Sequence, residues 1–94
     1  KNLSPLHLSC FRGFYQVTQL LLSYGAEVDC KEDNGLTPLF FAAINGHKNC
    51  CQLLIEKFHA DVNARDKEEK TVLHAVARKG NKEILQFLID LGAN

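Results

Sequence analysis

Ser4-Pro5-Leu6-His7 decides the fold, because close variants of this stretch return twice further along the chain. It recurs 33 residues later as Thr37-Pro38-Leu39-Phe40, and 34 residues after that as Thr71-Val72-Leu73-His74. A hydroxyl residue followed by proline is typical of a helix start. The hydroxyl accepts from free backbone N–H groups, and proline gives up no helical hydrogen bond there. The first helix of each repeated unit is therefore predicted to be capped at Ser4, Thr37 or Thr71.

Further landmarks return at the same offsets, so the repeat extends through the whole unit. Glycine recurs at positions 13, 46 and 80, where it would end the first helix after about two turns. A second helix is predicted from apolar residues with a 3.6-residue period. In successive units these residues are Val17, Leu20, Leu21 and Tyr24; Cys50, Leu53 and Leu54; and Ile84, Phe87, Leu88 and Leu91.

The spacing of the middle unit differs by one residue between Lys57 and His59, so we interpret Phe58 as an insertion. His59 stands where the other units have Gly25 and Gly92, at the position that closes a helix in the left-handed conformation. Histidine tolerates positive φ better than most residues, so we expect the same helix ending at all three positions.

Three units follow from these offsets, with boundaries at 1–33, 34–67 and 68–94, the third cut short. One helix pair cannot bury its apolar side alone, whereas stacked pairs share a continuous core. We predict one all-α domain over 1–94: a helical solenoid of three helix-turn-helix repeats with projecting loops. Neither end has a polar capping repeat. We therefore expect an interior segment of a longer array, and end-to-end association of chains in concentrated solution.

The three Ser/Thr stretches resemble the opening motif of ankyrin repeats, as do Gly46-His47 and the run Ala60-Asp61-Val62-Asn63-Ala64-Arg65-Asp66. The resemblance covers the whole chain and implies antiparallel helix pairs with hairpin-like loops along one edge. It also implies that partners bind on a concave face made of the loop tips and the inner helices. Three residues depart from the motif: Phe40 replaces histidine, Val72 replaces proline and Glu69 replaces the loop glycine.

Composition excludes several partners. Basic and acidic residues each number 11 of 94, so the formal net charge is zero. Nucleic acids and anionic membranes usually require a basic surplus, so we expect no nucleic-acid partner. No apolar run approaches the roughly 18 residues of a membrane span, and we expect no membrane insertion.

Two residue clusters invite a chemical interpretation. His7 and Cys10 could form a catalytic dyad, but His7 lies three residues after Ser4, where its ring would complete the helix cap. His47, Cys50 and Cys51 have a spacing that could chelate zinc, but a closed site needs a fourth ligand. Cys50 also aligns with Val17 and Ile84, which favours a buried apolar role. We therefore predict no catalytic residue, no metal and no cofactor.

The four cysteines show no disulfide pattern: two are adjacent and none forms a C-x-x-C pair. Unpaired thiols are typical of a cytoplasmic or nuclear protein.

The family resemblance also implies which residues meet a partner. In such repeats the exposed concave positions are the residue before the Ser/Thr cap, the pair before the first-helix glycine, and the loop tip. Carried onto this chain, they are Leu3, Phe11, Arg12, Lys31, Asp33, Asn34, Leu36, Ile44, Asn45, Arg65, Lys67, Glu68, Lys70, Arg78 and Lys79.

Equivalent positions on this face change from apolar to basic along the stack, from Phe11 through Ile44 to Arg78. We expect a protein partner with apolar anchors at one end and acidic residues at the other. The alternative for Phe11 and Ile44 is that they pack into the groove between helices or cover a neighbouring repeat. The basic cluster of Lys70, Arg78 and Lys79 could also be a nucleic-acid site, but the acidic residues close by favour an ordinary solvated surface.

Two functions follow from this reading. The first is a non-enzymatic protein-interaction module of the scaffold or adaptor type. The second is a structural spacer that stacks on flanking repeats and binds no partner of its own. A spacer should have an unremarkable concave face, so the apolar side chains there favour the first function.

Overall fold

The computed structural model describes residues 2–93 as an all-helical chain, with no β-strand within that range. The segments are α1 (Pro5–Arg12), α2 (Tyr15–Ser23), α3 (Pro38–Ile44), α4 (Lys48–Gln52), η1 (Leu53–Lys57), α5 (Val72–Lys79) and α6 (Lys82–Asp90). Because η1 continues α4 without a break, the segments form three helix pairs. The predicted all-α solenoid of six helices is confirmed.

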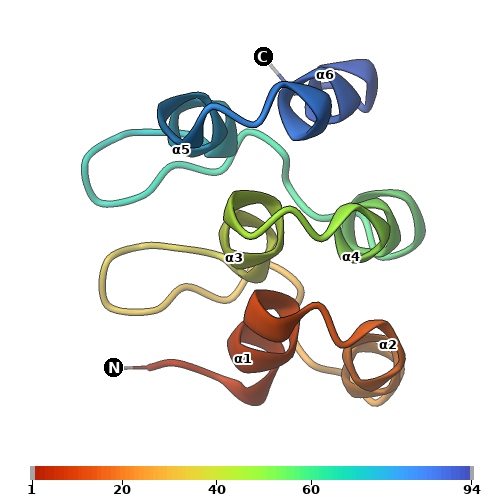
Figure 1. The fold of residues 1–94 in the computed structure, drawn as a ribbon. Helices are drawn as coiled ribbons and strands as arrows, with labels where there is room; N and C mark the ends of the chain where they lie inside the picture. The colour runs from red at the N-terminus through yellow and green to blue at the C-terminus, as the bar shows by residue number, and fades with distance from the viewer. Residues whose placement is uncertain (1, 94) are drawn as a thin grey trace.

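The helix pairs stack in two columns (Figure 1). We call α1, α3 and α5 the inner helices, and α2, α4 with η1, and α6 the outer helices. The α2–α3 loop and the η1–α5 loop both project on the side of the inner helices, away from the outer column. We call the surface formed by these loops and the inner helices the inner face. It is the counterpart of the concave face expected from the sequence.

The first inner helix begins as predicted because its cap is complete. Ser4 has an extended backbone, and its Oγ accepts a hydrogen bond from the backbone N–H of His7 at 3.2 Å. In return, His7 Nδ1 accepts from the backbone N–H of Ser4 at 3.1 Å. Pro5 follows at the first helical position, where no N–H is needed. Gly13 closes the helix with a left-handed φ of 73°.

The predicted side-chain cap at Thr37 is wrong. Thr37 has the backbone of a cap residue, but its buried Oγ1 has no hydrogen-bond partner among the described residues. The backbone N–H of Phe40 donates to the Thr37 carbonyl at 3.1 Å instead, and Phe40, in place of the capping histidine, has no ring nitrogen for the hydroxyl to bond. In the third repeat the pair is present again, because the backbone N–H of Thr71 donates to His74 Nδ1 at 3.1 Å.

The extra residue predicted at Phe58 is accommodated inside the helix. The η1 segment is a π-helix, and the backbone N–H of Phe58 bonds the carbonyl of Leu53, five residues earlier, at 3.3 Å. One wider turn takes up one more residue without changing where the helix ends. His59 then has the expected positive φ, 59°, matching the positive φ of Gly25 and Gly92.

A continuous core runs between the helix pairs. It consists of Leu6, Cys10, Leu22, Leu39, Phe40, Ala42, Ala43, Cys50, Cys51, Leu53, Leu54, Ala60, Val72, Val76, Ile84, Leu88 and Ala93. Within residues 2–93, every helix falls short of the length and apolarity that a membrane span needs.

Three of the four apolar residues predicted to define the second helix of the first repeat do not face this core, whereas Leu21 packs against it. Val17, Leu20 and Tyr24 are 48%, 58% and 86% exposed. Val17 aligns with Cys50 and Ile84, which are both buried, and this alignment wrongly predicted burial of Val17 as well. Of the elements described, none lies against that side of α2 (Figure 1).

Candidate functional site

A groove of about 760 Å³ lies on the inner face, between loop and helix. The η1–α5 loop forms one wall and the ends of α3 and α5 form the other. Its lining residues are Asn34, Leu36, Ile44, Asp66, Lys67, Glu68, Ala75, Arg78 and Lys79. The groove thus brings together loop-tip and inner-helix residues that the sequence placed on one surface.

The loop wall of this groove is held by backbone hydrogen bonds. The backbone N–H of Lys67 donates to the carbonyl of Asn34 at 3.0 Å, which ties one loop to the next. Within the η1–α5 loop, Asp66 Oδ1 accepts from the backbone N–H groups of Glu68 and Lys70 at 2.8 and 2.9 Å. Such turns fix the backbone, so the groove is formed before any partner arrives.

Side chains also stabilise the loops, one across the two loops and one within the η1–α5 loop. Lys31 Nζ donates to the carbonyl of Arg65 at 2.9 Å, and Arg65 Nη1 donates to the carbonyl of Glu69 at 3.2 Å. Asn2 Nδ2 donates to Asp33 Oδ1 at 2.9 Å. Lys31, Asp33 and Arg65 were predicted as partner contacts, and in the structure their side chains form these hydrogen bonds.

An apolar pocket of about 210 Å³ lies further along the inner face, between α1 and α3. It is lined by Leu3, His7, Leu8, Phe11 and Phe41. The ring of Phe41 meets His7 and Phe11 edge-on, with centroids 5.4 and 6.3 Å apart. Both ring nitrogens of His7 are already hydrogen-bonded, since Nδ1 accepts from Ser4 and Nε2 lies 3.0 Å from the carbonyl oxygen of Leu36. The pocket therefore presents hydrocarbon surface.

The fifteen predicted partner-binding residues divide into three sets. The groove takes in Asn34, Leu36, Ile44, Lys67, Glu68, Arg78 and Lys79. The apolar pocket takes in Leu3 and Phe11. The remaining six residues line neither the groove nor the apolar pocket: Arg12, Lys31, Asp33, Asn45, Arg65 and Lys70.

Sequence reasoning missed several lining residues: Leu8, Phe41, Asp66 and Ala75. A signal for two of them was available, since Leu8 and Phe41 occupy the same position of successive repeats and are both large. Phe11 is 46% exposed, whereas Ile44 is half-buried against the core.

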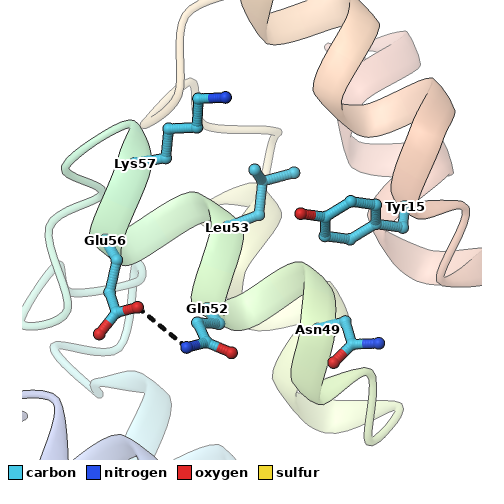
Figure 2. Close-up of a pocket in the computed structure, with 6 residues that line it drawn as sticks. All are labelled: Tyr15, Asn49, Gln52, Leu53, Glu56 and Lys57. Atoms are coloured by element: carbon cyan, nitrogen blue, oxygen red, sulfur yellow. Dashed lines mark hydrogen bonds between the residues drawn. The ribbon is translucent and has the colours of Figure 1, made fainter.

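A second groove, of about 450 Å³, lies between α2 and the α4–η1 helix (Figure 2). Its lining residues are Tyr15, Asn49, Gln52, Leu53, Glu56 and Lys57. Two of its polar side chains are bonded to each other, since Gln52 Nε2 donates to Glu56 Oε1 at 2.9 Å (Figure 2). This groove on the outer helices is the natural comparison surface for any test of the inner face.

The histidines of both cysteine–histidine clusters lie within hydrogen-bond distance of a backbone carbonyl in a neighbouring repeat. His47 Nε2 lies 2.9 Å from the carbonyl oxygen of Phe11, so its ring joins two repeats. Burial raises the pKa of the Cys10 and Cys51 thiols to about 12, and neighbouring Cys50 adds to both shifts. Residues 2–93 contain no group of three or more histidine, cysteine or acidic side chains suited to a metal ion.

Known proteins resemble this chain along almost its full length. A family model described as ankyrin repeats (3 copies) matches residues 6–94. Ankyrin repeat and KH domain-containing protein 1 of Homo sapiens is 38% identical over 93 residues, which cover 97% of this chain and 4% of that protein. Alpha-latrocrustotoxin-Lt1a of Latrodectus tredecimguttatus is 39% identical over 91 residues, which cover 97% of this chain and 6% of the toxin.

Structural comparison agrees. The crystal structure of the human ASB11 ankyrin repeat domain matches with a TM-score of 0.87 at 27% identity. The match covers 97% of this chain and 41% of that one. The chain thus spans a small part of the curated relatives described above, at 4% and 6% of their lengths.

Proposed function

From the premise that this chain belongs to the ankyrin repeat family, we propose that it docks a partner protein on its inner face. Repeats of this kind generally serve as protein-interaction modules, and stacked repeats create extended binding surfaces. The observation that carries the proposal is the preformed groove that loop and inner-helix side chains line together.

Exposed apolar side chains on the same face support this proposal. Leu3 and Phe11 are 47% and 46% exposed beside the apolar pocket. Clustered apolar surface on a folded chain most often marks an interaction site. Aromatic side chains in such clusters contribute a large share of binding energy.

Exposed apolar residues on another side of the molecule support a second candidate function, a structural spacer. Val17, Leu20 and Tyr24 are 48%, 58% and 86% exposed along α2 and at its C-terminal end. A flanking repeat stacked there would bury them. A chain that acts only as a spacer would need no groove on its inner face, so we rank this function second.

The proposed role is non-enzymatic, as part of a scaffold or adaptor. His7 and His47 each lie within hydrogen-bond distance of a backbone carbonyl, and Cys10, Cys50 and Cys51 are buried in the core. We place the protein in the cytoplasm or nucleus, which suits its four free thiols.

The test compares inner-face and outer-face variants in capture experiments from cell extract. Phe11→Ala removes the exposed apolar ring, and Tyr24→Ala removes an 86% exposed ring from an outer helix as its control. Arg78→Glu reverses a charge in the last turn of α5, and Lys57→Glu does the same in the last turn of η1. Circular dichroism of each variant checks that the helices are retained.

A protein held by the original chain and by both control variants, but lost by Phe11→Ala and Arg78→Glu, is the expected result. Loss with Tyr24→Ala or Lys57→Glu instead would place binding on the outer helices. If no protein distinguishes the four variants, the spacer function is favoured.

A further inference from the structure

The apolar pocket fits one kind of side chain. Its walls are leucine and phenylalanine, and its one polar residue, His7, has both ring nitrogens occupied. A polar side chain entering this pocket would lose its water without gaining a hydrogen bond, which is unfavourable. A large aliphatic or aromatic side chain would gain from the same burial. The pocket therefore selects for an apolar anchor.

The groove beside α5 fits the opposite chemistry. Arg78 and Lys79 line it from the last turn of the helix, and neither forms an ion pair with any residue in the range 2–93. Lys67 adds a third cation to this lining, and Asp66 and Glu68 add two carboxylates. Asp66 accepts from backbone N–H groups, and Glu68 lies 3.8 Å from Lys70. The groove thus carries a surplus of one positive charge, which favours a partner carboxylate.

These two sites lie on one continuous face. Ile44 and Leu36 line the groove next to α3, and the carbonyl of Leu36 also contacts His7 in the apolar pocket. Neighbouring packed helices are roughly 8–10 Å apart, so the two sites are separated by about 10–20 Å. An extended chain advances about 3.3 Å per residue and covers that span in roughly three to six residues.

We infer that the partner presents an extended segment with one large apolar residue and, roughly three to six residues away, a cluster of acidic residues. The apolar side chain fills the pocket between α1 and α3, and the acidic side chains lie over Arg78 and Lys79. This inference rests on the proposed docking function and specifies its ligand. Charge complementarity at α5 and hydrocarbon walls at α1 together choose this segment over a uniformly apolar or a basic one.

Selection from a displayed library of random peptides tests the inference, because no natural partner needs to be known. Peptides are selected on the original chain at low salt, where charge pairing is strongest. We expect the enriched sequences to share an apolar residue and nearby aspartate or glutamate at the spacing given above. Synthetic peptides from this set should bind about tenfold more weakly to Phe11→Ala.

A charge swap is the decisive arm. Arg78→Glu should weaken binding of the acidic peptides. Replacing the acidic residues of these peptides by lysine should restore binding to that variant. Lys57→Glu is the matched control and should leave the affinity of both the acidic and the lysine-substituted peptides unchanged. Enriched peptides without acidic residues, equal binding to Arg78→Glu, or no enrichment at all would overturn the inference.

The same experiment distinguishes failure of this inference from failure of the proposed docking function. If the peptides no longer bind Phe11→Ala but bind Arg78→Glu normally, the inference of an acidic segment is wrong, while docking on the inner face is still supported. If the peptides bind Phe11→Ala normally but no longer bind Tyr24→Ala, both the acidic-segment inference and docking on the inner face are wrong.

Discussion

The Nε2 atom of His7 lies 3.0 Å from the backbone carbonyl oxygen of Leu36, which joins the first helix of one repeat to the loop of the next. The same ring accepts at Nδ1 from the backbone N–H of Ser4, so Nδ1 carries no proton and Nε2 is the donor to Leu36. One buried side chain therefore completes a helix cap and an inter-repeat contact at once.

His7→Phe should lower the free energy of unfolding by about 1–3 kcal/mol, because it leaves the Ser4 N–H and the Leu36 carbonyl without partners. The matched variant is His74→Phe, which removes a similar cap at an exposed ring. Water can replace that lost bond, so its effect should be smaller. Urea denaturation of both variants measures the difference, and equal losses would contradict the inter-repeat role of His7.

Thr37→Val should leave stability unchanged or raise it by up to about 1 kcal/mol, because the substitution removes a buried hydroxyl that has no partner. Thr71→Val is the control and should lower stability by about 1 kcal/mol, since Thr71 Oγ1 lies 3.1 Å from His74 Nδ1. Thermal melting of the two variants compares them. A large loss with Thr37→Val would mean that its hydroxyl is hydrogen-bonded after all.

His59→Gly should stabilise the chain by about 0.5–1 kcal/mol. His59 has φ of 59°, and a side chain in the left-handed region costs about 1–2 kcal/mol. Glycine avoids this cost, but it loses more conformational freedom on folding than histidine does, which offsets part of the gain. Gly25→Ala provides the reverse change at the equivalent position and should destabilise. Chemical denaturation measures both, and a destabilised His59→Gly would contradict this account of the helix ending.

Gly35→Ala should destabilise the chain more than Gly80→Ala. Both glycines have positive φ, 80° and 78°, so both substitutions incur the same backbone strain. A Cβ at Gly35 would also lie 2.7 Å from the backbone nitrogen of Lys67, whereas a Cβ at Gly80 meets nothing within 4 Å. The difference in melting temperature isolates the loop–loop contact. Equal effects would mean that the two loops are not in close contact in solution.

Cys10 and Cys51 should resist alkylation in the folded chain, whereas half-buried Cys30 should react first. Burial raises the pKa of both thiols from 9.0 to about 12, so their folded-state pKa exceeds the unfolded one. Their contribution to stability is therefore complete below pH 9.0 and is lost as the pH rises toward about 12. Iodoacetamide labelling read by mass spectrometry checks the order. Early labelling of Cys10 would contradict its burial.

Much of the fold could be predicted from the sequence because each repeat carries its own local signals. The caps at Ser4 and Thr71, the left-handed ending at His59 and the insertion before it all depend on neighbouring residues. The form of the insertion could not be predicted, since a π-helical turn and a longer loop both hold one extra residue. Phenylalanine replaces the motif histidine at position 40, and this replacement was visible in the sequence. The unpaired hydroxyl of Thr37 was not predicted from it.

The candidate site was less predictable, because it depends on contacts between repeats. The sequence indicated which positions face inward, but it could not reveal that Lys31 would bond the carbonyl of Arg65. Nor could it show that Phe41 forms a wall of a pocket with Phe11. The exposure of Val17 was missed for a related reason, since a residue's burial in a stack depends on the element beside it.

We expect the partner to bind the inner face, and an NMR titration reports the contact surface residue by residue. The ¹⁵N-labelled chain is titrated with one of the selected peptides. The largest shift changes should occur at the amides of Phe11, Leu36, Ile44 and Arg78, while those of Tyr15, Gln52 and Lys57 remain in place. Shift changes concentrated at Tyr15, Gln52 and Lys57, with the inner face unmoved, would contradict binding at the inner face.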